Sequence, residues 1–242
     1  MGSYYYLMSR LPTLPGRLGE RMAVGFGWLA GQARANLSPY DLGPLEALLS
    51  EADIANYIFI RTETAKRLPG GRLSDADIAQ GRDLPEAVRL FVLEEERGIS
   101  RPYPYDRLWE LHFAEAMETA RRSGSAFLRS YLPWNYQLRN VLAELRCRAA
   151  SLDPGSHLVR AGGDGYGFGR MIAELQDQAN PLDAMLYLDR QRLQFITGCL
   201  DYDGFSLDAL LGYLAQARIF DQWQDYTLPY DLQTITQAGG TK

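Results

Sequence analysis

The chain has 242 residues, of which 46% are hydrophobic and 23% are charged, and its formal net charge is −5. A chain of this length and apolar content can bury a large core, which excludes an intrinsically disordered protein. The acidic balance argues against nucleic acid as a partner, because binding phosphates requires clustered cations. It permits docking onto a basic protein surface.

The two cysteines, Cys147 and Cys199, are too few for a disulfide framework, and we expect two small thiols that face the core. The opening MGSYYYLMSR lacks the pattern of a secretory signal. No apolar stretch approaches the ~20 residues that a membrane-spanning helix needs. We therefore expect a cytoplasmic protein, which can still sit against a structure that is not cytoplasmic.

In chain order, the first predicted element is a short extended segment, because three tyrosines at residues 4–6 precede Leu7 and Met8. The sequence LPTLPG at residues 11–16 interrupts any regular structure. Four later segments then carry the signals of a helix start, with a capping side chain followed by proline or an acidic residue. These segments are SPYD at 38–41, SDAD at 74–77, DLPE at 83–86 and NPLD at 180–183.

Hydrophobic periodicity predicts amphipathic helices in the same regions. One apolar stripe spans residues 84–92, a second spans 207–217, and the longest spans about 125–150. Pro133 is expected to kink or break that longest helix near Tyr131. No sustained alternation of period two is present, so the predicted fold is all-α, built from packed helical hairpins.

The predicted organisation is one continuous domain in three parts. Residues 1–152 form an N-terminal helical region, 153–169 a glycine-rich connector, and 170–242 a C-terminal helical hairpin. The final residues, 239–242, are expected to be frayed.

The glycine-rich connector invites comparison with a dinucleotide-binding turn. That turn needs the spacing G-x-G-x-x-G at the end of a strand of a parallel sheet, whereas glycines at 163–169 recur at every second position. We therefore interpret the connector as a flexible loop between helices. Of the two histidines, His112 is expected to be packed within a helix and His157 to be solvated, so we expect no metal ion and no cofactor.

Polar residues lie close to the strongest apolar stripe, near Trp134. Polar groups at such positions must find partners or cost several kcal/mol each. Two interpretations remain open: a structural network between two hairpins, or a contact surface for an acidic partner. The residues are Asn135, Arg139, Asn140, Arg146 and Arg148.

The opening SYYYLMSRLPTLPG at residues 3–16 resembles the N-terminal signature of a bacterial family of uncharacterised proteins associated with V-type ATPases. The similarity continues through LSPYDL at 37–42 and, after Trp134, through LRNVL at 138–142 to Arg146. This family is similar to a shortened form of the C subunit of V/A-type ATPases, whose eukaryotic counterpart is the d subunit.

The C-terminal sequence is similar to the last helical hairpin of that C subunit, in which a helix with a tyrosine leads to an Arg-Trp or similar pair. Tyr213 and Trp223 match this pattern, while Gln222 stands where a basic residue is usual. Both join the candidate interaction residues, which are then Trp134, Arg139, Asn140, Arg146, Tyr213 and Trp223.

The resemblance implies a funnel-like, all-α adaptor without catalytic activity. Such an adaptor lies between the rotating central stalk and the membrane ring of proteolipid subunits and transmits torque between them; an assembly factor is the related possibility. The chain is shorter than the C subunit with its three repeats, which leaves open whether a full funnel forms. Two alternatives remain: a free-standing helical interaction protein, and an enzyme that holds a phosphate-bearing ligand with its glycine-rich loop.

Overall fold

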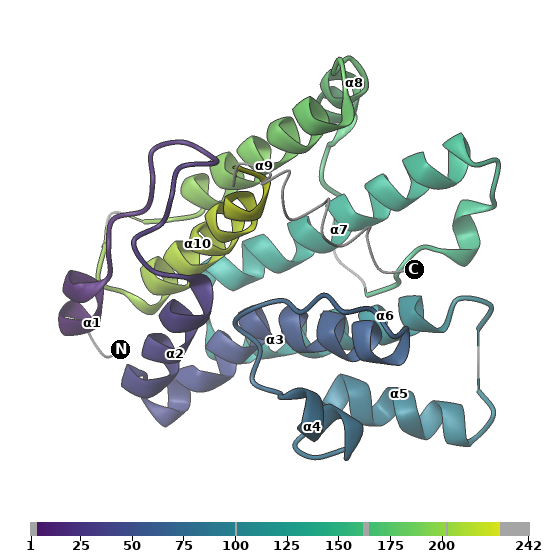
Figure 1. The fold of residues 1–242 in the computed structure, drawn as a ribbon, viewed down its shortest axis with the longest axis horizontal. Helices are drawn as coiled ribbons and strands as arrows, with labels where there is room; N and C mark the ends of the chain where they lie inside the picture. Colours follow the sequence, from purple (N-terminus) through teal and green to yellow (C-terminus); the bar gives the residue numbers. More distant parts are fainter. Residues whose placement is uncertain (1–3, 100, 162–164, 202, 228–242) are drawn as a thin grey trace, which may run out of the picture.

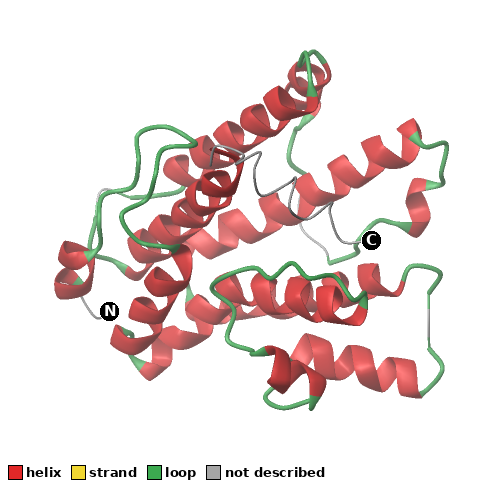
Figure 2. Ribbon diagram, in the orientation of Figure 1, coloured by secondary structure: helices red, strands yellow, loops and turns green. Residues whose placement is uncertain are grey.

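The structure is a computed structural model that describes residues 4–99, 101–161, 165–201 and 203–227. Within these ranges the fold is all-α, as predicted, with no β-strand (Figures 1 and 2). The α-helices are α1 (Tyr5–Arg10), α2 (Phe26–Asn36), α3 (Pro39–Arg61), α4 (Asp75–Ala79), α5 (Glu86–Glu96), α6 (Pro104–Ser123), α7 (Ala126–Ala149), α8 (Gly169–Gln176), α9 (Pro181–Gly198) and α10 (Leu207–Thr227), and η1 (Pro154–Ser156) is a short 3-10 helix. The predicted frayed residues, 239–242, lie outside the described ranges.

Helices α3 and α6 pack along each other at the centre of the molecule. The short helix α4 and helix α5 lie on one side of this pair, and α7 leads from it to the hairpin of α9 and α10 (Figure 1). Helix α2 contacts both α3 and α10, so segments distant in sequence close around a shared core. Among the described residues, every helix is too short or too polar to cross a lipid bilayer.

The buried side chains follow the predicted stripes. In α5, Val88 and Phe91 belong to a cluster shared with α3 and α6. In α10, Leu210, Leu211 and Leu214 are fully buried in the main core. Burying such side chains stabilises each helix by roughly 1.5–3 kcal/mol per residue, which is why these stripes fold as helices. Both cysteines are free thiols: Cys147 is buried, and Cys199 only partly so.

The N-terminal segment departs from the prediction, because Tyr5–Arg10 is helical instead of extended. Tertiary contacts override the local preference of the tyrosines. Leu7 is buried against the core, the Tyr4 amide donates to the carbonyl of Phe205 at 3.0 Å, and the Tyr4 hydroxyl donates to Asp41.

Pro133 does not break the long helix, which runs continuously as α7 from Ala126 to Ala149. Proline removes one backbone hydrogen bond and crowds the preceding turn, at a cost of about 3 kcal/mol. Buried side chains on both sides of Pro133, including Leu132 and Trp134, offset this cost.

A helix begins within each of the four predicted segments, at Pro39, Asp75, Glu86 and Pro181. Ser74 and Asp77 form the complete capping box. The predicted capping side chains are wrong at two starts: Ser38 makes no capping hydrogen bond to α3, and α5 has no capping side chain of its own. Asp83, the cap predicted for α5, has a positive φ of 50°.

Carboxylates from other helices cap several helix starts instead. Glu115 of α6 accepts a hydrogen bond from the Ala87 amide in the first turn of α5, at 3.1 Å. Asp221 of α10 accepts from the Phe26 amide at the start of α2, at 2.8 Å. These contacts satisfy first-turn amides that would otherwise lack a partner, and they fix how the helices are placed relative to one another.

Candidate functional site

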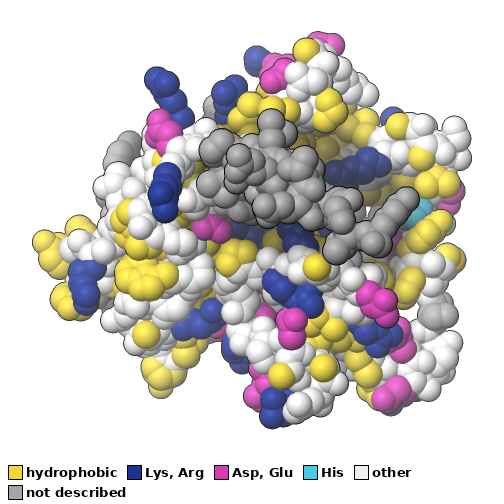
Figure 3. All heavy atoms as spheres, viewed as in Figure 1, with side chains coloured by type: hydrophobic (Ala, Val, Ile, Leu, Met, Phe, Trp, Pro, Cys, Tyr) yellow, Lys and Arg dark blue, Asp and Glu magenta, His cyan; other side chains and the backbone are white. Residues whose placement is uncertain are grey.

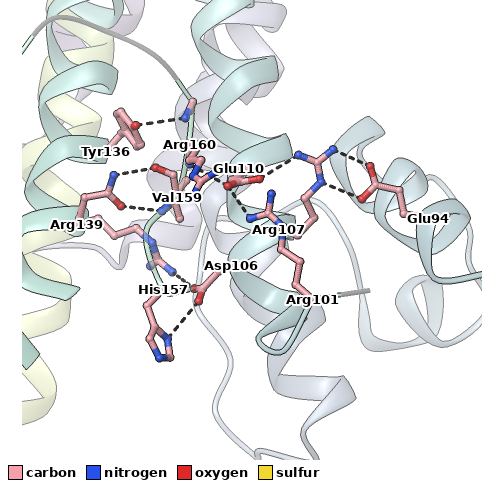
Figure 4. A network of polar contacts seen from close by, with 12 residues as sticks. Glu94, Arg101, Asp106, Arg107, Glu110, Tyr136, Arg139, His157, Val159 and Arg160 are labelled. Carbon is pink, nitrogen blue, oxygen red and sulfur yellow. Dashed lines mark hydrogen bonds and ion pairs between the residues drawn. The ribbon is translucent and has the colours of Figure 1, made fainter. Parts of the chain in front are cut away.

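Residues 159–161 of the connector are anchored to helices α7 and α6. The Asn140 side chain of α7 donates to the carbonyl of Val159 at 2.8 Å and accepts from the Val159 amide at 3.0 Å. The Tyr136 hydroxyl accepts from the Ala161 amide at 3.2 Å (Figure 4). This part of the connector is therefore not the free loop that the glycine content predicted.

Glu110 of α6 is the centre of the polar network beside the connector (Figure 4). Its carboxylate is 2% exposed and accepts from Arg101 at 2.8 Å, Arg107 at 3.0 Å and the amide of Arg160 at 3.0 Å. Arg107 also binds Glu94 of α5 through two nitrogens, at 2.7 and 2.9 Å. One buried carboxylate thus links α6 to the connector, and its arginine partner continues the link to α5.

His157 lies against protein instead of being solvated as predicted. Its ring packs on Tyr103 with 3.8 Å between centroids, and its Nδ1 lies 3.6 Å from Asp106. The same carboxylate lies 3.7 Å from the Arg139 guanidinium, which covers the ring of Trp109 at 4.5 Å. The half-buried Asp106 draws both side chains toward the start of α6, so His157 is only partly exposed.

The charges in this network are held in their ionised forms to different degrees. Burial alone would raise the pKa of Glu110, but hydrogen bonds from Arg101 and Arg107 outweigh it, and the pKa is lowered. Burial raises the pKa of Asp106, although Arg139 and His157 oppose the shift. Burial also disfavours the charged form of Arg139, and for a base this lowers the pKa.

A second buried cluster lies where α3, α6, α7 and α10 meet. Glu51 accepts from Arg218 at 2.5 Å and from the Asn135 amide group at 2.7 Å. Burial alone would raise the pKa of Glu51, but the charge of Arg218 outweighs it and the pKa is lowered. Burial lowers the pKa of the neighbouring His112 to about 4, so this imidazole is neutral at pH 7. The prediction of a packed His112 is confirmed.

Comparison with known protein families shows which family the chain belongs to. A family described as "Protein of unknown function (DUF2764)" matches residues 1–228. The chain belongs to this family. No curated protein and no solved structure matches the chain.

The six candidate interaction residues of this DUF2764 protein do not form one site. Arg139 and Asn140 belong to the connector network, while Arg146 is exposed near the end of α7. Trp134 is buried and stacks on Phe195 at 4.3 Å between ring centroids.

The two C-terminal candidates make internal contacts. Tyr213 donates through its hydroxyl to the carbonyl of Pro12 at 2.7 Å, which holds the segment after α1 against α10. Trp223 is buried, and its Nε1 donates to Asp189 of α9 at 2.8 Å. Of the two interpretations left open for the polar residues near Trp134, the structural network accounts for Asn135, Arg139 and Asn140.

The sequence did not reveal the acidic residues at the centres of the two clusters. Glu110 lies two positions before His112 on α6, and both are buried among apolar residues. Glu51 lies on helix α3, close to the buried side chains of Leu48 and Ala52. A charged residue inside an apolar stripe is a weak signal of a buried ion pair, but the partners of both residues come from other elements of the fold.

The glycine-rich run is described only in part, because residues 162–164 lie outside the described ranges. Gly165 and Gly167 face open space, with no atom close enough to require a glycine. The Tyr166 amide donates to Gln137 of α7 at 2.7 Å. In the part of the chain that the structure describes, no group of three or more histidine, cysteine or acidic side chains is placed to hold a metal ion.

Proposed function

We propose that this DUF2764 protein is a non-catalytic adaptor of a bacterial V/A-type ATPase, which links the central stalk to the membrane ring or assists their assembly. Its location would be cytoplasmic, with contact to the membrane only through these partners. The proposal starts from the resemblance of residues 3–16, 37–42 and 138–142 to a family associated with V-type ATPases. The contacts within the helical body then supply physical support.

The observation that carries the proposal is a contrast between two kinds of side chain. Charged side chains inside the molecule bind each other, whereas a group of aromatic side chains at one end is exposed. The buried Glu110 and the largely buried Glu51 bind other elements of the same chain. A body tied together in this way resists relative movement of its helices, which suits a part that transmits force between partners.

Aromatic side chains at one end are instead left exposed. Tyr5, Tyr6, Tyr40 and Phe205 define the N-terminal aromatic surface, and their exposed fractions are 62%, 67%, 93% and 38%. Tyr5 contacts Phe205 with 4.5 Å between ring centroids, and Arg10 lies over the ring of Tyr6. Figure 3 shows hydrophobic side chains at the end of the molecule where Figure 1 places α1. Exposed tyrosines beside arginine are typical of the anchor residues of protein interfaces.

Affinity purification of the full chain from its native cells tests the proposal. We expect the wild-type chain to recover stalk and ring subunits of the ATPase. The double variant Tyr6→Ser with Tyr40→Ser should recover at least about tenfold less, because truncating interface anchors costs about 2 kcal/mol or more.

The matched control is Leu152→Ser. Leu152 is 49% exposed and follows the end of α7, at the opposite end of the molecule from α1 (Figure 1). This variant should recover the same subunits as the wild type. Recovery of no ATPase subunit by the wild-type chain contradicts the adaptor role and favours a free-standing interaction protein.

A further inference from the structure

A cavity of about 200 Å³ adjoins the N-terminal aromatic surface, where the residue before α1, the turn from α6 to α7 and the segment leading into α10 meet. Phe205 belongs to both features, because it lines the cavity, is 38% exposed and contacts the ring of Tyr5. Sites for drug-sized ligands occupy roughly 300–1,000 Å³. This smaller cavity has room for a single side chain, which would lie next to the exposed aromatic rings.

Two carboxylates in the wall are fixed to the residues that join the cavity to the aromatic surface. The Tyr4 hydroxyl donates to Asp41, and the Tyr4 amide donates to the carbonyl of Phe205 at 3.0 Å. The Phe205 amide in turn donates to the Asp203 carboxylate at 3.0 Å. These contacts place Asp41 and Asp203 beside the same two residues, and all four line the cavity.

Asp208 supplies a third carboxylate from the first turn of α10. Within the described ranges, the three carboxylates accept hydrogen bonds from neutral hydroxyl and amide groups only, and the wall contains no lysine, arginine or histidine. The positive ends of α3, α7 and α10 offset part of the charge, but each amounts to only about half an elementary charge. The cavity therefore keeps an excess of negative charge.

Arginines that are close to the wall in sequence have other contacts. Arg122 forms an ion pair on the surface of α6, and Arg129 donates to the backbone carbonyl of Ser125. Arg10 lies over the ring of Tyr6. In the part of the chain that the structure describes, the counter-charge of the cavity is thus left to a group from outside.

We propose that this cavity receives an arginine side chain of the protein that binds the N-terminal aromatic surface. A guanidinium group is always charged, carries several N–H donors and stacks on aromatic rings, so it matches carboxylates placed beside Phe205. A basic partner also agrees with the net charge of −5. The inference rests on the proposed function, because it names the partner chemistry of the same surface.

A titration of the isolated full chain tests this chemistry without any ATPase subunit. The probe is Nα-acetyl-arginine methylamide. Its citrulline counterpart, at equal chloride concentration, has a neutral urea group in place of the guanidinium. The amides of Phe127 and Phe205 report binding in ¹H–¹⁵N NMR spectra, because both donate to carboxylates of the cavity. We expect saturable shifts of both signals with the arginine probe only.

The variant Asp203→Asn removes one charge from the wall but keeps an oxygen that can accept from the Phe205 amide. It should weaken binding of the arginine probe about fivefold, as expected for the loss of one partly exposed ionic partner. Asp201→Asn is the matched control, because Asp201 is exposed in the same segment and does not line the cavity. This variant should bind like the wild type.

Unchanged signals of Phe127 and Phe205 throughout the titration would overturn the inference. Equal shifts with the two probes would also overturn it, as would an Asp203→Asn variant that binds like the wild type. Either result leaves the adaptor role standing if the wild-type chain still recovers ATPase subunits from cells. Recovery of no ATPase subunit by a chain that binds the arginine probe would instead contradict the adaptor role and support the ligand chemistry of the cavity.

Discussion

At the scale of single residues, Asn140 shows how one side chain positions a whole segment. Its amide group pairs with both backbone groups of Val159, much as a neighbouring strand would. Val159 is 1% exposed, so water cannot replace these hydrogen bonds. An apolar side chain at position 140 would leave a buried amide and a buried carbonyl unpaired.

Replacement of Asn140 by alanine should lower the free energy of unfolding by about 2 kcal/mol, because unpaired buried backbone groups carry a desolvation penalty. Urea unfolding measures this difference. Asn36→Ala is the control, since Asn36 is exposed and donates only to the carbonyl of Gln32. That change should stay within about 0.5 kcal/mol. Equal effects of the two substitutions would contradict the anchoring role of Asn140.

His112 predicts a specific loss of stability in mild acid. Burial lowers its pKa to about 4 in the folded chain, while an unfolded histidine has a pKa of roughly 6.5. The unfolded chain therefore takes up a proton between these values and the folded chain does not, so unfolding becomes more favourable as the pH falls. Between pH 7 and pH 5 this loss should amount to about 2 kcal/mol.

Urea unfolding at pH 7, 6 and 5 isolates this effect by comparison of variants. His112→Gln removes the titrating group, so its stability should fall by about 2 kcal/mol less than that of the wild type over this range. A His112→Gln variant with the same pH dependence as the wild type would show that His112 does not titrate as a buried neutral group.

At the scale of helices, the capping contacts separate what the sequence can predict from what it cannot. The starts at Asp75 and Pro181 use local caps, Ser74 and Asn180, and both were visible as short motifs. The starts of α2 and α5 use Asp221 and Glu115, which lie far away in sequence. No local pattern marks such a partner, because the contact exists only after the helices pack.

Asp208 offers a direct test of these distant caps. It lies in the first turn of α10, and its carboxylate accepts from the Ser125 hydroxyl and from the amides of Ala126 and Phe127 at the start of α7. Asp208→Ala should lower the free energy of unfolding by about 1–2 kcal/mol, the usual effect of losing a helix cap. Thermal or urea unfolding measures the change.

The control for this prediction is Asp201→Ala. Asp201 is exposed in the segment before α10, and the change should stay within about 0.5 kcal/mol. If Asp208→Ala were equally neutral, the carboxylate would not be needed to join the two helix starts.

Gly212 shows the same limit of sequence reasoning. Within α10 a glycine costs roughly 0.8–1.0 kcal/mol relative to alanine, and the local sequence offers no reason for it. In the structure the Leu200 side chain packs so closely against Gly212 that a Cβ would clash with it. The glycine is therefore explained by tertiary packing and not by any turn.

At the scale of the whole molecule, the helix periods predicted the fold class and the faces that pack into the core. They did not predict which helices contact each other or which side chains connect them. Glu51 of α3 and Arg218 of α10 are 167 positions apart, yet they form an ion pair that closes the chain on itself. The acid and the base of this pair lie in the apolar stripes of two different helices. Each one interrupts the hydrophobic period of its own helix, and the period does not indicate that the two residues are partners.

The candidate site was predictable only in part for the same reason. Arg139 and Asn140 were singled out because polar groups beside an apolar stripe need partners. Their partners, Asp106 and the backbone of Val159, come from another helix and from the connector. The N-terminal aromatic surface was visible as residues, but their exposure depends on how α1 folds against the core.

The adaptor role makes one prediction that can be tested only in cells and not on the isolated chain. Membranes from native cells that lack the protein should show a lower ratio of transported ions to hydrolysed ATP, or less assembled enzyme, because stalk and ring would be poorly joined. The wild-type chain should restore both quantities, and the Tyr6→Ser, Tyr40→Ser variant should not. If cells without the protein assemble the same amount of ATPase and transport ions at the same ratio, the adaptor role is wrong.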